Sequence, residues 1–65
     1  MTELERVEGG IATLRESIRI ARLALAEPGL PADDRSRWQA SVDLYERHLR
    51  ELLAVRDDLR SLAED

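Results

Sequence analysis

The chain has 65 residues, which is enough for one small domain but too few to bury a large core. It contains no cysteine and one histidine, so we expect a protein partner, rather than disulfides or a metal ion, to supply the missing stability. The net charge of −4 argues against nucleic acid or an anionic membrane as that partner, because both require a basic surface.

A helix is predicted over about residues 3–27. Thr2 precedes it and Glu5 follows three positions later, which forms a capping box for backbone N–H groups that the first helical turn leaves free. Along this helix, apolar residues recur at alternating spacings of three and four, the heptad pattern of coiled coils. They are Leu4, Val7, Ile11, Leu14, Ile18, Ala21 and Leu25.

Gly9 and Gly10 lie inside this predicted helix, where each glycine costs about 1 kcal/mol relative to alanine. In one interpretation, Gly10 permits close packing of a second helix while the first two turns fray. In the other, these turns form a soft N-terminal arm that becomes ordered on a partner. Ser17 and Ala24 are also small and follow Gly10 at heptad spacing on the same flank of the helix. This pattern predicts that another helix packs closely against that flank.

A turn is predicted at residues 28–31, where Pro28, Gly29 and Pro31 fall within four residues. Proline cannot donate to a helix ladder, and glycine tolerates the left-handed geometry that often follows a helix end. The chain is therefore predicted to be one all-α domain over residues 1–65, an antiparallel two-helix hairpin that resembles a coiled coil.

The second helix is predicted over about residues 32–63. Its apolar seam is regular except for one short step from Leu52 to Val55, a stammer that overwinds a coiled coil locally. Arg56 lies beside this step, and we expect it either to pair with Glu3 or to be replaced in the seam by Val55. The seam residues are Trp38, Val42, Tyr45, Leu49, Leu52, Val55, Leu59 and Leu62.

Matching the two seams across the turn predicts which residues face each other. The smallest seam residue, Ala21, is placed opposite the largest, Trp38. The same register brings Arg15 near Glu46, a complementary pair worth less than about 1 kcal/mol when exposed.

Apolar residues that this register leaves without an intrachain contact predict a partner-binding surface. Leu59 and Leu62 are expected to lie beyond the start of the first helix, whereas Trp38 is either a core residue or part of an anchor patch near the turn. A hairpin that exposed such residues would be unstable and adhesive, so we expect a protein partner or a homodimeric four-helix bundle to complete it. The predicted partner-binding residues are Ile20, Leu23, Leu30, Trp38, Leu53, Leu59 and Leu62.

Polar residues give little sign of chemistry. His48 is the single histidine, and no carboxylate occupies a seam position, so no catalytic, metal or cofactor site is expected and the chain is predicted not to be an enzyme. Arg35, Gln39 and Asp43 form a stripe that is either a solvated face or part of a cyclic-dinucleotide motif like that of an actinobacterial anti-sigma factor. No apolar run approaches the roughly 20 residues of a membrane span, and no signal peptide is evident, so a cytoplasmic location is expected.

The N-terminal pattern Met1, Thr2, Leu4 and Glu5, together with the aromatic-Gln pair Trp38-Gln39, resembles the small co-chaperones of type III secretion needle subunits. That resemblance implies a helical hairpin that binds a tetratricopeptide-like chaperone and helps to hold an aggregation-prone needle subunit before export. The alternative is a homodimeric four-helix-bundle protein that regulates or senses a small ligand.

Overall fold

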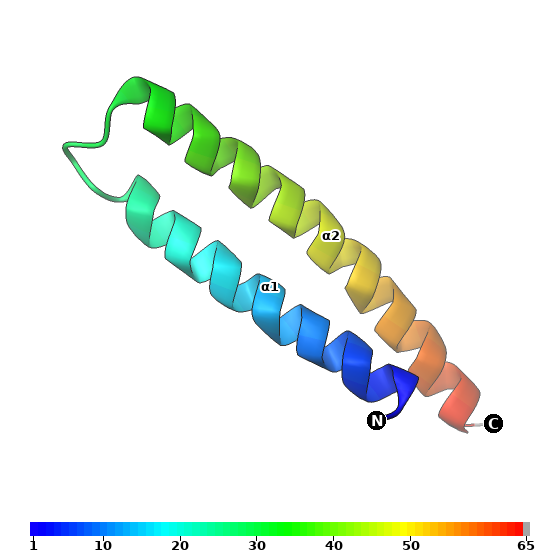
Figure 1. Cartoon of the computed structure of the whole chain (residues 1–65). Coiled ribbons are helices and arrows are strands. Elements are labelled where there is room, and N and C mark those ends of the chain that lie inside the picture. The colour runs from blue at the N-terminus through cyan, green and yellow to red at the C-terminus, as the bar shows by residue number, and fades with distance from the viewer. Residues whose placement is uncertain (65) are drawn as a thin grey trace.

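Two antiparallel helices joined by a short turn make up the fold (Figure 1). The computed structural model describes residues 1–64, with α1 at Glu3–Leu25 and α2 at Ala32–Glu64. The helices lie side by side along an elongated body of 52 × 17 × 14 Å, and the start of α1 and the end of α2 lie opposite the turn. The predicted all-α hairpin is confirmed.

Helix α1 begins with one half of the capping box that the sequence predicts, the half supplied by Thr2. The Thr2 hydroxyl oxygen accepts a hydrogen bond from the Glu5 backbone N–H at 3.1 Å. The hydroxyl in turn donates to the Glu5 carboxylate, also at 3.1 Å, so the carboxylate binds the Thr2 side chain. Glu3 and Glu5 also place negative charge at the positive end of the helix dipole.

Helix α1 ends at Leu25, two residues before the predicted boundary, and a side chain of the other helix caps this end. The Arg35 guanidinium donates from Nη1 to the Leu25 carbonyl at 2.9 Å and from Nη2 to the Glu27 carbonyl at 3.4 Å. No glycine among the described residues has a positive φ, so the left-handed geometry expected at Gly29 does not occur. A side-chain cation caps the helix instead, where the helix dipole favours positive charge.

Helix α2 begins directly after Pro31, whose carbonyl accepts the Arg35 backbone N–H at 2.9 Å. Proline suits this place because the first N–H groups of a helix have no intrahelical acceptor. Asp33 and Asp34 in the first turn add favourable negative charge there.

The core of the hairpin is thin and unequally shared. Among the residues whose burial the structure describes, five apolar side chains are buried, and four of them come from α1. The larger seam residues of α2, including Trp38 and Tyr45, are only half-buried. The buried residues are Ile11, Leu14, Ile18 and Ala21 on α1, and Val42 on α2.

Two ion pairs between the helices define their register. Arg22 binds Glu46 at 3.4 Å, and Arg60 binds Glu8 at 3.1 Å. The partners of the two pairs are two heptads apart on each helix, so both pairs report the same alignment. This alignment places Ala21 in one layer with Val42.

The predicted register is therefore wrong by about one helical turn. Glu46 pairs with Arg22 and not with Arg15, and Ala21 faces Val42 rather than Trp38. The contact between Gly10 and Leu52 agrees with the observed register, since a Cβ atom added at Gly10 would lie 3.1 Å from Leu52 Cδ1.

The predicted stammer in α2 is also wrong. Val55 points outward and is 40% exposed, whereas Arg56 is half-buried and continues the heptad pattern from Leu52 to Leu59. In the observed register Arg56 lies opposite Val7. No ion pair joins Arg56 to Glu3 within residues 1–64, so neither role predicted for this arginine is observed.

In the observed register, α1 covers α2 further toward the C-terminus of α2 than predicted. Arg60 reaches Glu8, and Leu59 in the same turn is half-buried. The prediction that Leu59 lies beyond the first helix is therefore corrected. Leu62, one turn later, is 71% exposed.

Candidate protein-interaction surface

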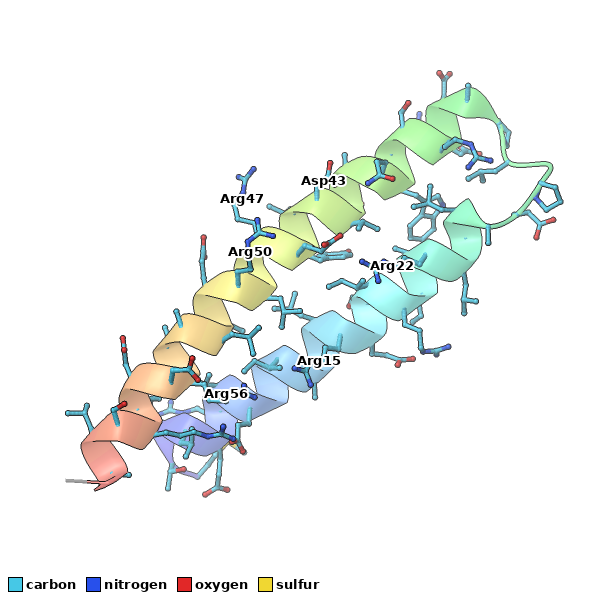
Figure 2. The ribbon with its side chains drawn as sticks, turned by 180° about the vertical axis from the view of Figure 1, so that it is seen from behind. Arg15, Arg22, Asp43, Arg47, Arg50 and Arg56 are labelled. Carbon is cyan, nitrogen blue, oxygen red and sulfur yellow. The ribbon has the colours of Figure 1, made fainter. Side chains whose placement is uncertain are left out.

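The two edges of the hairpin, where the flanks of α1 and α2 meet, differ in character. We call one the apolar edge, because its flanking heptad positions carry large exposed apolar side chains. We call the other the arginine edge, because Arg15, Arg22 and Arg56 lie along it (Figure 2). The apolar edge is formed by Ile20 (48% exposed), Leu44 (59%), Val55 (40%) and Leu62 (71%).

Small residues of α1 border the apolar edge. Gly10, Ser17 and Ala24 are each half-buried and one heptad apart. A Cβ atom at Gly10 would crowd Leu52, so this glycine allows the helices to approach closely, as the first interpretation predicts. Gly9 has nothing within 4 Å of its Cβ position, so packing does not explain it.

A shallow hollow of about 300 Å³ opens on the apolar edge. Leu14 and Tyr45 are among its walls, and Leu44 and His48 lie at its rim. His48 is exposed, and the described residues hold no group of three metal-ligating side chains. Arg47 and Glu51 complete the lining of the hollow.

The arginine edge carries a larger groove, of about 460 Å³. Ile18 and Leu49 come from opposite helices and line it together with Leu23 and charged side chains. Arg22 and Glu46 close one part of the groove by their ion pair. The charged lining residues are Arg15, Arg19, Arg22 and Glu46.

Arg15 and Arg19 differ in their partners within this groove. Arg19 donates from Nε to the Glu16 carboxylate at 3.0 Å, and this hydrogen bond lowers the pKa of the Glu16 carboxyl and raises that of Arg19. Arg15 has no ion pair within the described residues. The groove thus contains one guanidinium, that of Arg15, without an acidic partner beside the apolar side chains that line it.

Arg56 lies on the same edge, toward the end of the hairpin that is opposite the turn. Its Nε atom is buried and has no hydrogen-bond partner in the described residues. A buried donor without an acceptor is costly, because the group has lost its water without gaining another bond. Figure 2 shows Arg22, Arg15 and Arg56 one after another along the gap between the two ribbons.

The seven predicted partner-binding residues do not form one patch. Ile20, Leu23 and Leu62 are exposed, whereas the other four are half-buried. Leu23 borders the groove of the arginine edge, and Trp38 borders a separate hollow with Asp34. The half-buried residues are Leu30, Trp38, Leu53 and Leu59.

The sequence did not reveal every residue of the two edges. Val55 is exposed on the apolar edge, whereas its apolar side chain placed it in the predicted seam; Leu44, which lies off that seam, is exposed as its position predicts. The arginines beside the groove were also missed. Arg15 and Arg22 are one heptad apart on the flank of α1, a spacing that indicates one edge of a coiled coil.

The polar stripe on α2 has partners within the chain. Arg35 binds the carbonyls of Leu25 and Glu27, so it serves as a helix cap. Gln39 Nε2 donates to Asp43 Oδ1 at 3.0 Å.

The chain matches no protein-family model, and no curated protein or solved structure is significantly similar to it. None of the helices described here is long and apolar enough to span a membrane. The two edges of the hairpin are the features that bear on its function.

Proposed function

We propose that the chain is a non-catalytic protein-interaction module whose apolar edge packs against helices of a different protein. One observation carries this proposal. The core has only five buried residues, whereas four large apolar residues are exposed on one edge. Several large exposed apolar residues along one edge are typical of interaction sites. The core alone gives a hairpin little stability, and a partner's helices would extend it.

The hairpin exposes more surface than a compact protein of its mass. The solvent-accessible surface is 4913 Å², whereas a compact monomer of 7.4 kDa exposes about 4,200 Å². The excess of about 700 Å² follows from the elongated shape, which leaves the flanks of both helices uncovered. A partner packed along one edge would cover part of this surface.

The arrangement of the apolar edge suits helix-to-helix packing. Leu44, His48 and Val55 are spaced by one turn and one heptad, the spacing by which one helix docks on another. Ser17 and Ala24 on the facing flank leave room for close approach. In its most specific form, the proposal is a cytoplasmic co-chaperone of a type III secretion needle subunit, which the N-terminal and Trp38-Gln39 resemblance supports.

The proposal is tested by titrating the purified chain into a purified tetratricopeptide-type chaperone of a needle subunit, followed by calorimetry. A double variant, Leu44→Gln with Val55→Gln, should abolish binding and leave the hairpin helical. Leu23→Gln is the matched control, because Leu23 is 61% exposed and Leu44 is 59% exposed, yet Leu23 borders the other edge. The co-chaperone form is wrong if the wild-type chain does not bind the chaperone with or without its needle subunit.

The second candidate is a homodimeric four-helix bundle formed through the same edge. The observation that favours it is that the exposed apolar residues come from both helices, so a two-fold axis would bring identical surfaces together. Sedimentation equilibrium with circular dichroism, from high micromolar to below one micromolar chain, separates the candidates. A dimer that persists across this range, with helicity lost only as it dissociates, would overturn the hetero-complex.

A further inference from the structure

We propose that the arginine edge is a second docking surface, which binds an amphipathic helix of a partner protein whose apolar face is flanked by carboxylates. This surface is separate from the apolar edge, so the inference goes beyond the proposed function. It would allow the hairpin to contact two helical elements at once, one on each edge.

The groove has the composition that such a helix requires. Ile18 and Leu49 supply apolar surface from opposite sides, and Leu23 extends it. The groove runs between the axes of the two antiparallel helices, which lie side by side, and a third helix can insert an apolar face there. Its volume of about 460 Å³ has room for large apolar side chains.

The charge of the edge selects acidic residues. Arg15 has no ion pair in the described part of the chain, although the protein carries a net charge of −4. Arg56 has a buried Nε without an acceptor. The Arg56 side chain as a whole is only half-buried, so a carboxylate of a partner helix can reach its exposed part.

The spacing of the arginines matches a helix rather than an extended peptide. Arg22 and Arg15 are one heptad apart on α1, and the register places Arg56 opposite Val7, about one heptad further along. One heptad of α-helix spans about 10 Å. A partner helix lying along the groove would therefore meet the three guanidinium groups with carboxylates at heptad intervals.

A second copy of this chain fits this edge poorly. Arg15 lies near the middle of α1, which spans Glu3–Leu25. A two-fold-related copy in full overlap would bring the two Arg15 side chains toward each other, and like charges in an interface are unfavourable. The complementary occupant is therefore an acidic helix of another protein.

The test uses the full-length chain and a fluorescently labelled synthetic helical peptide of three heptads. The peptide carries leucine at its a and d positions and glutamate at its flanking e and g positions. A control peptide has lysine in place of every glutamate. Anisotropy titrations should give saturable binding of the acidic peptide, which tightens as the salt concentration is lowered, and at least about tenfold weaker binding of the lysine peptide.

Matched variants locate the binding site. Arg15→Glu should weaken binding of the acidic peptide about tenfold or more, since it replaces an attraction by a repulsion. Arg6→Glu is the control, because Arg6 is also exposed on α1, also has no ion pair in the described residues, and lies on the flank toward the apolar edge. It should change the affinity less than twofold, and circular dichroism should show both variants folded.

Other results overturn the inference. It is wrong if the acidic peptide does not bind, if both peptides bind equally, or if Arg15→Glu and Arg6→Glu have equal effects. It is also wrong if Arg15→Glu changes the sedimentation of the chain alone, since the edge would then be a self-contact. The double variant Leu44→Gln with Val55→Gln should keep its affinity for the peptide, which separates failure here from failure of the proposed function.

Discussion

The Arg35 guanidinium on α2 caps the C-terminus of α1, with Nη1 lying 2.9 Å from the Leu25 carbonyl oxygen. The bond joins residues on opposite sides of the turn and places a cation at the negative end of the α1 dipole. It satisfies one of the carbonyls that every helix leaves without an intrahelical donor. The turn is thus held by a side chain of the helix that follows it.

Replacing Arg35 with glutamine should destabilise the hairpin by about 1 kcal/mol, because a charge-assisted bond to a helix end is lost at an exposed site. For a domain of this size, the loss corresponds to a melting temperature lower by about 4–8 °C, measured by circular dichroism. Arg37→Gln is the control, since Arg37 makes only a 3.9 Å pair with Asp34. Equal melting temperatures for the two variants would contradict the capping role.

The two glycines in α1 should respond differently to alanine. Gly9→Ala should stabilise the hairpin by about 0.5–1 kcal/mol, because its Cβ meets nothing within 4 Å and alanine has the higher helix propensity. Gly10→Ala should gain less or nothing, because the new Cβ would lie 3.1 Å from Leu52 Cδ1 and that side chain must shift. Urea unfolding of both variants measures the difference, and a larger gain at Gly10 would contradict the close packing seen there.

The bond from Arg19 to Glu16 should be visible in an acid titration. It holds the pKa of the Glu16 carboxyl below its ordinary value of 4.5, so the pair favours the folded state above that pH. The contribution is lost as the pH falls through the lowered pKa, because the folded state must then take up the proton. A carbon-detected NMR titration should show the lowered pKa, and Arg19→Gln should return it toward 4.5.

The fold could be predicted from the sequence because its determinants are local. Thr2 and Glu5 mark the start of α1, the heptads run along both helices, and Pro28 with Pro31 mark the turn. The register could not be predicted, because shifting two heptad seams past each other by about one turn still matches apolar residues with apolar residues. What distinguishes the registers is the set of flanking ion pairs, and those are individually weak.

The functional edges were harder to predict than the fold. Val55 is more apolar than Arg56 and was therefore assigned to the seam, yet the structure exposes Val55 and half-buries Arg56. An arginine can occupy a seam position because its aliphatic stem packs while its charged end reaches the edge. This single exchange moves Val55 to the apolar edge and Arg56 to the arginine edge.

Arg56 should therefore limit stability. Arg56→Leu removes a buried donor that has no acceptor and places an apolar side chain opposite Val7, so it should stabilise the hairpin by about 1–2 kcal/mol in urea unfolding. Arg50→Leu removes the same charge from an exposed position of α2 and should give no comparable gain. A loss of stability in Arg56→Leu would mean that the arginine is better satisfied than its geometry indicates.

The same substitution separates stability from binding. If Arg56 serves the arginine edge, Arg56→Leu should bind the acidic helical peptide more weakly while it unfolds at a higher urea concentration. Such opposite changes are expected where a residue that is unfavourable for folding is kept for a partner. A variant that gains stability and keeps full affinity for the acidic peptide would remove Arg56 from the docking surface and leave Arg15 and Arg22 to carry it.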